Sequence, residues 1–282
     1  MASTVVADIG GTSSRWGVLR AGQEALVLDG LQGFNPAVGE PDAFVESVGE
    51  RFGKEGVDVG DLFAYGAGCG SPERAMRMAE TLLSIWPQAR VDVASDLLGA
   101  AHGLLGDRSG LVLILGTGMN AGWYDGAKLH QPMPSLGYIL GDEGSGADIG
   151  KHIVRDALHG RLPKEVMAVV FPDGADVPNV VKELYRGSSP QAWLAGFTGR
   201  LVPLLAHPYV QALVAERFRK LALLLRGYFN EGERAEVYAT GSVAFGLIGP
   251  LRAALAEEGM RLSEVEPSPL PGLLRYRSAL AR

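Results

Sequence analysis

Cysteine is nearly absent from this sequence, which has one, Cys69, in 282 residues. A single cysteine cannot form a disulfide within the chain, and it excludes a cysteine-rich zinc or iron–sulfur site in one copy. Chains without disulfides are typical of reducing compartments, so we expect a cytoplasmic protein. The five histidines also lack the paired spacing that metal sites use.

Long apolar runs and an excess of positive charge are missing too. No uninterrupted apolar segment approaches the roughly 20 residues of a membrane span. The formal net charge is −6, whereas nucleic-acid binding usually requires a basic patch. We therefore expect neither a membrane nor a nucleic acid as a partner, although a local pocket can still bind a phosphate.

The composition is that of a globular chain with more than one core. The hydrophobic content is 47%, and 282 residues are enough for two domains of about 150 residues each. Strand-like runs alternate with helix-like spacing, and the pattern starts again near residue 110. The expected strands lie at 4–8, 15–20, 24–31, 62–67, 90–94, 110–115, 121–124, 128–129, 236–240 and 260–265. The expected helices lie at 41–53, 72–85, 97–105, 141–158, 191–205, 209–229, 241–258 and 273–280.

This alternation predicts an α/β fold with two domains. We place the first domain at residues 1–108 and the second at 109–269. The closing helix, within residues 270–282, is a candidate to complete the first domain.

The first turn of the chain, Asp8-Ile9-Gly10-Gly11-Thr12, follows an apolar strand and precedes another. Its glycines let backbone N–H groups approach an anion, and Thr12 can donate a hydrogen bond. Asp8 would repel a bare phosphate, so its natural partner is Mg²⁺ or a metal-bound water. The alternative is a hairpin in which the glycines only make the turn.

Two further glycine turns and one carboxylate also follow apolar strands. The turns are Gly116-Thr117-Gly118-Met119-Asn120 and Gly241-Ser242-Val243. Ligands of open α/β sheets bind at such strand ends, and the repeated strand–turn–strand pattern indicates a duplicated unit with a ligand clamped between the halves. Asp96, after Ser95, is either a helix N-cap or a general base that accepts a hydroxyl proton during phosphoryl transfer.

A second dense motif, Gly137 to Gly146, contains Asp142 and Glu143 among four glycines. It is either a capped helix start or a set of acids that accept hydrogen bonds from sugar hydroxyls. Asn35 lies in the polar loop Gly33-Phe34-Asn35-Pro36, where the plain interpretation is a turn residue.

Taken in order, five of these motifs resemble those of a known family over nearly the whole chain. They are Asp8-x-Gly-Gly-Thr12, Ser95-Asp96, Gly116-Thr-Gly-x-Asn120, Gly141-Asp-Glu-Gly-Ser145 and Gly241-Ser-Val243. Together they are similar to the motifs of N-acetylglucosamine kinases, in the BadF/BadG/BcrA/BcrD ATPase group of the actin-like superfamily that includes hexokinase. The resemblance implies two RNase H-like (actin-like ATPase) domains, with ATP and a sugar in a central interdomain cleft.

The resemblance also implies a role for each motif. ATP would contact the three glycine turns, through Gly10, Gly11, Thr12, Gly116, Thr117, Gly118, Gly241, Ser242 and Val243. Asp8 would lie near Mg²⁺, through a water, and Asp96 would bind the sugar as the catalytic base on its 6-hydroxyl. Asn35 and Asp142 would hold other sugar hydroxyls, with Gly137 and Tyr138 in the pocket wall.

The identity of the sugar stays open. Animal N-acetylglucosamine kinases carry Gly-Gly-Trp-Gly where this sequence has Pro134-Ser135-Leu136-Gly137. N-acetylglucosamine is the first expectation, and glucosamine, N-acetylmuramic acid and glucose are alternatives. A homodimer is an expectation from the family.

The sequence argues against three other protein classes. A non-catalytic sugar or nucleotide sensor would not need a base at Asp96. Activators of radical dehydratases need four cluster cysteines per dimer, whereas one cysteine per chain gives at most two per dimer here. Repressor-type glucokinases usually carry a cysteine-rich zinc motif, which this sequence lacks.

Overall fold

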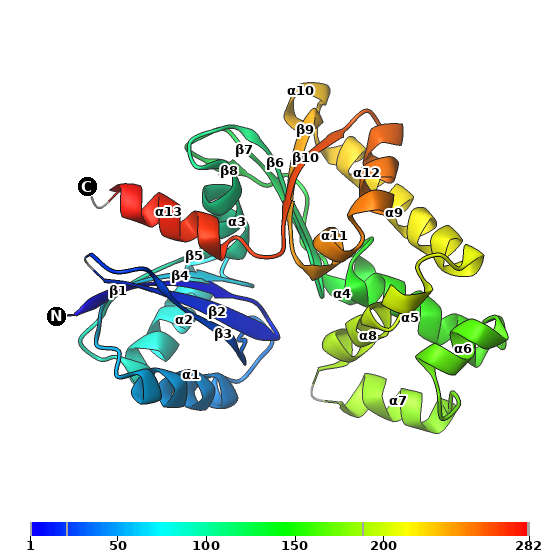
Figure 1. Cartoon of the computed structure of the whole chain (residues 1–282), viewed down its shortest axis with the longest axis horizontal. Helices are drawn as coiled ribbons and strands as arrows, with labels where there is room; N and C mark the ends of the chain where they lie inside the picture. Colours follow the sequence, from blue (N-terminus) through cyan, green and yellow to red (C-terminus); the bar gives the residue numbers. More distant parts are fainter. Residues whose placement is uncertain (1, 21, 188, 281–282) are drawn as a thin grey trace. The chain divides into compact units, whose positions relative to one another are not determined.

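The computed structural model describes residues 2–20, 22–187 and 189–280. The chain divides into two compact units (Figure 1). Unit 1 comprises Met1–Arg108 and Ser268–Arg282, and unit 2 comprises Ser109–Pro267. Among the described residues, no helix has the length and apolar character needed to cross a membrane.

Unit 1 is built on a five-stranded mixed sheet in the order β3-β2-β1-β4-β5. Strand β1 pairs antiparallel with β2 and parallel with β4, so that it lies at the centre. The strands are β1 Ser3–Ile9, β2 Ser13–Leu19, β3 Leu26–Gln32, β4 Val59–Gly66 and β5 Arg90–Ser95. The helices are α1 Asp42–Glu55, α2 Pro72–Ile85, α3 Asp96–Leu105 and α13 Leu270–Leu280.

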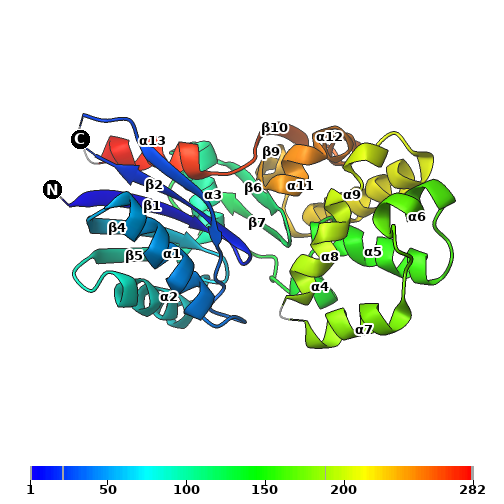
Figure 2. The same cartoon turned by 60° about the horizontal axis from the view of Figure 1, so that its bottom comes forward.

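Helices cover both faces of this sheet (Figure 2). One face packs against α1 and α2 around the fully buried Trp16, Phe44 and Leu82. On the other face α13 lies against α3, and a Cβ on Gly272 would lie 2.6 Å from the Gly103 carbonyl carbon. Glycine at this crossing lets the two helices approach closely.

Unit 2 repeats the sheet of unit 1 strand for strand, in the order β10-β9-β6-β7-β8. The central strand β6 pairs antiparallel with β7 and parallel with β9. The strands are β6 Gly110–Leu115, β7 Met119–Tyr124, β8 Leu129–His130, β9 Glu236–Thr240 and β10 Arg261–Glu266. The expected duplication of a strand–turn–strand unit is therefore present in the fold.

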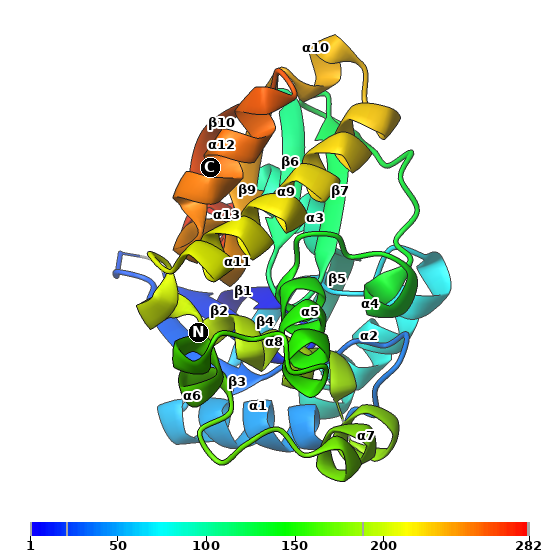
Figure 3. The same ribbon diagram turned by 90° about the vertical axis from the view of Figure 1, so that its right-hand side faces the viewer.

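The helices of unit 2 lie mainly between β8 and β9 in sequence. Figure 3 shows the long helix α9 crossing the sheet, where its apolar side chains share a core with β6 and β9. The helices are α4 Gly137–Leu140, α5 Gly146–Leu158, α6 Lys164–Val170, α7 Val177–Arg186, α8 Pro190–Gly199, η1 Val202–Leu204, α9 Pro208–Tyr228, α10 Glu231–Arg234, α11 Ser242–Gly246 and α12 Ile248–Glu257.

Three predicted helices were wrong in extent. The helix expected from 141 begins only at Gly146, because Asp142 takes a left-handed φ of 61° and Ser145 caps α5. The helix expected over 191–205 ends at Gly199, and a short 3₁₀ turn with Pro203 at its centre follows. The helix expected over 241–258 is interrupted at Leu247, which has non-helical dihedral angles.

Candidate active site

The first glycine turn of unit 1 is fixed by its own hairpin and by the loop after β3. Gly10 N–H donates to Ser13 O at 2.9 Å, and Phe34 N–H donates to Gly10 O at 3.0 Å. A Cβ on Gly33 would lie 2.5 Å from Ser13 N, so only glycine fits there. Gly11 and Thr12 stay exposed, with open space beside Gly11 apart from Asn35 Cβ at 3.9 Å. The turn therefore presents backbone and a hydroxyl to solvent, as an anion site requires.

Asn35 lies beside this turn, which its position in the sequence does not reveal. Its Oδ1 accepts Ala37 N–H at 2.9 Å, so Asn35 is a turn residue, as its plain interpretation had it, and the turn is of the Asx type. Gly68, at φ 76°, leaves room for the amide, since a Cβ there would lie 2.8 Å from Asn35 Cγ. Within the described ranges, no hydrogen bond occupies the Asn35 side-chain nitrogen, which is thus available to a ligand.

Asp8 is a half-buried carboxylate at the end of β1. Its Oδ2 accepts a hydrogen bond from Ser268 Oγ at 3.1 Å, across 260 positions of sequence. Burial raises the pKa of Asp8 to about 6, against the lowering effects of Ser268 and Arg15. Ser268, on the segment leading into α13, is a partner of Asp8 that the sequence did not predict.

Asp96 stands at the first position of α3, and the N-cap is Ser95, whose side chain accepts Leu98 N–H at 3.2 Å. Asp96 Oδ1 accepts Leu97 N–H at 2.8 Å. Burial raises the pKa of Asp96 to about 7; this hydrogen bond opposes the shift, and the Asp8 carboxylate reinforces it. Asp8 and Asp96 are thus two carboxyls with raised pKa values in unit 1, and such groups are more frequent at functional sites than elsewhere.

The nearby Cys69 is part of the packing. Its side chain is buried in the unit 1 core, and the thiol donates only a weak hydrogen bond to Ala67 O at 3.8 Å. Burial, together with the charge of Asp96, raises the pKa of the thiol to about 12. Cys69 is therefore protonated at neutral pH and is not a nucleophile.

The second glycine turn, in unit 2, is fixed by a helix instead of a loop. Gly116 N–H donates to Gly118 O at 3.0 Å. The first N–H groups of α5 donate to the turn, Gly146 to Gly116 O at 2.8 Å and Ala147 to Thr117 O at 3.1 Å. The turn and the start of α5 therefore form one hydrogen-bonded structure.

Asp142 and Gln191 converge on this turn. A Cβ on Gly118 would lie 2.9 Å from both Asp142 Oδ2 and Gln191 Nε2, and Gln191 donates to Asp142 at 3.0 Å. Asp142 is buried, and burial raises its pKa to about 6, although an N–H bond from Met119 opposes the shift. Gln191 was missed by the sequence interpretation, because it lies 49 positions from Asp142.

The third glycine turn lies against the second within unit 2. Gly241 has φ 114°, and a Cβ there would lie 2.5 Å from Leu115 O at the end of β6. Ser242 is exposed, whereas the Val243 side chain is buried in the unit 2 core. Only the backbone of Val243 is therefore available to a ligand.

The two residues expected in the pocket wall lie on α4. Gly137 begins this helix at φ 70°, and Tyr138 packs partly against the unit 2 core while its carbonyl accepts Lys151 Nζ at 3.1 Å. A small cavity of about 40 Å³ is lined by Leu136, Asp142 and Met119 among others, and neither Gly137 nor Tyr138 lines it.

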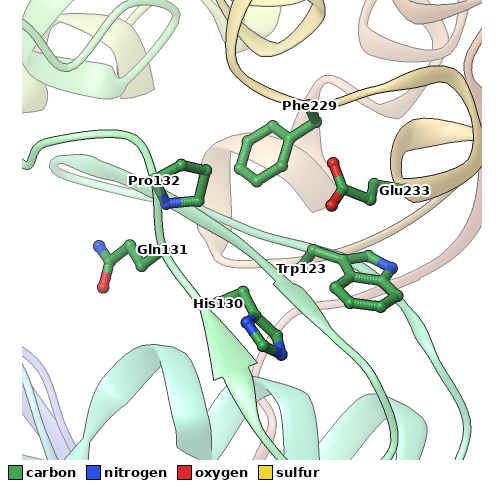
Figure 4. A pocket seen from close by; sticks show the side chains of 6 residues that line it. All are labelled: Trp123, His130, Gln131, Pro132, Phe229 and Glu233. Carbon is green, nitrogen blue, oxygen red and sulfur yellow. The ribbon is translucent and has the colours of Figure 1, made fainter.

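A larger cavity of about 390 Å³ lies at the opposite end of β7 from the glycine turn (Figure 4). Its polar groups serve the local fold. Glu233 accepts Asn230 N–H in a capping box, and His130 is hydrogen-bonded to Asp125 at 2.9 Å and packs against Trp123. We do not assign the active site to this cavity.

The donor set near Asp8 fits a cation that is held mainly by other ligands. In the described parts of the chain, no group of three or more His, Cys, Asp or Glu side chains could hold a metal ion. Mg²⁺ is commonly bound through one or two carboxylates, with waters and substrate phosphates as the remaining ligands. A single carboxylate beside a phosphate-type turn is compatible with that mode.

Comparison with solved structures decides the family. A protein from Porphyromonas gingivalis, described as a putative N-acetylglucosamine kinase, is 31% identical over 100% of both chains, with a TM-score of 0.89. This chain belongs to the N-acetylglucosamine kinase-like family. The family predicted from the five motifs is thereby confirmed. No family model and no curated protein matches the sequence.

More distant structures share the fold. A Chromobacterium violaceum protein with the same description is 17% identical, with a TM-score of 0.65, and covers 98% of this chain and 99% of its own. A ROK family glucokinase from Streptomyces griseus, in complex with glucose and AMPPNP, is 17% identical, with a TM-score of 0.58 and 99% coverage of both chains. The predicted fold class, α/β of the actin-like ATPase type with two domains, is confirmed.

Proposed function

We propose that this protein is an ATP-dependent sugar kinase that transfers the γ-phosphate to the 6-hydroxyl of an amino sugar, with N-acetylglucosamine as the first candidate. The observation that carries the proposal is the position of Asp96, a carboxylate directly after β5 at the start of α3, in a chain that is 31% identical over its whole length to a putative N-acetylglucosamine kinase. Burial raises the pKa of Asp96 to about 7. A base with a pKa near the working pH combines a useful ionised fraction with proton affinity.

In this proposal Asp96 accepts the proton of the acceptor hydroxyl as that oxygen attacks the γ-phosphorus, and the bond from this phosphorus to the β–γ bridging oxygen breaks to release ADP. Asn35 and Asp142 bind other sugar hydroxyls, and Gly137 and Tyr138 contribute to the pocket wall. Phosphoryl transfer asks the protein mainly for positioning and charge neutralisation, which one carboxylate and backbone donors can supply.

The three glycine turns are proposed to bind ATP. Gly10, Gly11 and Thr12 would donate to phosphate oxygens, as would Gly116, Thr117 and Gly118. Gly241, Ser242 and the backbone of Val243 would approach the adenosine. Asp8 would hold Mg²⁺ through a water, and the bound cation would supply positive charge to the phosphates.

The test measures ADP release with ATP and Mg²⁺ in the presence of N-acetylglucosamine, glucosamine, N-acetylmuramic acid or glucose. We expect N-acetylglucosamine to give the highest kcat/KM, with one sugar phosphate formed per ADP and NMR placing the phosphate on O6. ADP release that no sugar raises above the sugar-free rate would refute the kinase. A higher kcat/KM for another sugar would refute only the choice of acceptor.

A further inference from the structure

The surroundings of Asp142 in unit 2 point to a residue with no role in the proposal so far. Asp142 is the only non-glycine residue with positive φ in the described ranges, at 61°. Its neighbours hold this conformation, because Ser145 N–H donates to Asp142 O at 3.0 Å and Gly144 N–H to Asp148 Oδ2 at 2.9 Å. Asp148 is in turn fixed by Arg217, whose Nε donates to Oδ2 at 2.8 Å.

These contacts hold the backbone of the turn, whereas the Asp142 carboxylate is held by other groups. Gln191 Nε2 donates to its Oδ2 at 3.0 Å, and Met119 N–H also donates to the carboxylate. Among side chains in the described residues, Gln191 is the one whose hydrogen bond to this carboxylate the structure records. A neutral amide donor orients the carboxylate without adding a charge to a buried site.

Helix α8, which carries Gln191, packs closely against α5 beside the glycine turn at Gly116. Helix α8 lies so close to α5 that a Cβ on Gly146 would lie 3.1 Å from Ala195 Cβ, and one on Gly150 would lie 2.7 Å from the Leu194 carbonyl carbon. The buried Thr198 hydroxyl donates to Gly146 O at 2.7 Å. Gly146 also donates to the glycine turn at Gly116, so α8, α5 and the turn are connected.

We infer that Gln191 is a positioning residue that orients the Asp142 carboxylate for the sugar. This inference rests on the proposed function, because it takes Asp142 as a ligand of the acceptor. Gln191 fixes the Oδ2 oxygen of the carboxylate. The remaining acceptor capacity of the carboxylate would serve a sugar hydroxyl. Asp142 and Gln191 also fill the space beside Gly118. A change at Gln191 should therefore affect sugar binding more strongly than binding of the phosphates at the glycine turn.

Loss of Gln191 is expected to raise the pKa of Asp142. A donor to the ionised carboxylate lowers the pKa, so loss of Gln191 moves the pKa of Asp142 further above 6. The other charges that face Asp142 are Glu143 and Asp148, which raise this pKa, and Lys151, which lowers it. A glutamate at position 191 would add a third carboxylate and raise the pKa further.

The experiment measures the Kd of N-acetylglucosamine by calorimetry from pH 5.5 to 8.5 in an Asp96→Asn background, which removes the titration of Asp96. We compare this background with the same protein carrying Gln191→Ala or Gln191→Glu. Below pH 7 we expect sugar affinity to fall about tenfold for Gln191→Ala and further for Gln191→Glu, the scale of one hydrogen bond to a charged group. The loss should shrink as the pH rises and Asp142 ionises again.

Gln211→Ala, at an exposed glutamine on α9, is the matched control and should leave every Kd unchanged. In the otherwise native enzyme, Gln191→Ala should raise the KM for N-acetylglucosamine more than the KM for ATP. A pH-independent loss, or equal losses for sugar and ATP, would overturn the positioning role and indicate a general structural one. A native enzyme without sugar-dependent turnover would instead refute the proposed function, so the two failures are distinguishable.

Discussion

The two units have the same five-stranded sheet but fix its glycine turn by different means. In unit 1 the turn is held by a loop, through Phe34 N–H and the close packing of Gly33. In unit 2 the corresponding turn is held by the first N–H groups of α5. The same local motif thus depends on two unrelated supports, because a three-residue turn does not fix its own surroundings.

The acidic side chains beside the turns differ in the same way. In unit 1, burial raises the pKa values of both Asp8 and Asp96, and the charge of Asp8 raises that of Asp96 further. In unit 2, Asp142 is one carboxylate with an amide partner, Gln191. In the proposed function, Asp96 of unit 1 accepts the proton, whereas Asp142 of unit 2 helps to orient the sugar. Four predictions test this contrast.

The largest expected effect separates Asp96 from Asp142. Asp96→Asn should lower kcat by about 10²- to 10⁴-fold, the usual contribution of a general base. Asp142→Asn should act mainly on the KM of the sugar. Steady-state kinetics with N-acetylglucosamine measure both, with Asp107→Asn, an exposed acid of unit 1, as the control. A larger loss of kcat from Asp142→Asn would reverse the assignment.

The support of the unit 1 turn gives the second prediction. Gly33→Ala places a methyl group against the backbone of the turn, which should destabilise the protein by about 1–3 kcal/mol, as overpacking does. Gly11→Ala has space beside it and should leave the melting temperature unchanged while raising the KM for ATP. Calorimetric melting of the two variants checks the contrast, and equal melting temperatures would contradict it.

The pH dependence of turnover gives the third prediction. In the proposed function, Asp96 must be ionised to accept a proton and Asp142 to bind the sugar, and burial raises their pKa values to about 7 and about 6. The kcat/KM for the sugar should therefore rise with pH up to about 7 and then level off. It should fall about tenfold per pH unit just below the pKa of Asp96 and more steeply below that of Asp142. Rates measured from pH 5.5 to 8.5 decide, and a flat profile would exclude both acids from catalysis.

The smallest effect concerns stability. The pKa of Asp96 is raised in the folded state, so its stabilising contribution is complete at low pH and is lost as the pH rises through 7. Asp96→Asn should thus raise the melting temperature by a few degrees at pH 8, with a smaller gain at pH 5. Thermal melts at the two pH values test the sign. A lower melting temperature at pH 8 would show that Asp96 is stabilising there.

Much of the fold could be predicted from periodicity. Strands such as β6 and β9 lie at the predicted residues, since a buried apolar run between turn signals is a strong local pattern. The start of α5 was predicted less accurately than these strands. A left-handed aspartate at 142 interrupts the apparent helix, and the hydrogen bonds that hold this conformation arise only in the folded unit.

The sequence by itself determined the family, the glycine turns and the acids that follow the strands, because these are contiguous motifs with local geometry. The tertiary structure alone decided which residues support them. Ser268 reaches Asp8 over 260 positions, Gln191 reaches Asp142 over 49, and Gly33 packs under a turn two strands away. Such partners carry no sequence signal, since a serine, a glutamine or a glycine gains its role only when packing brings a carboxylate or a backbone within contact distance.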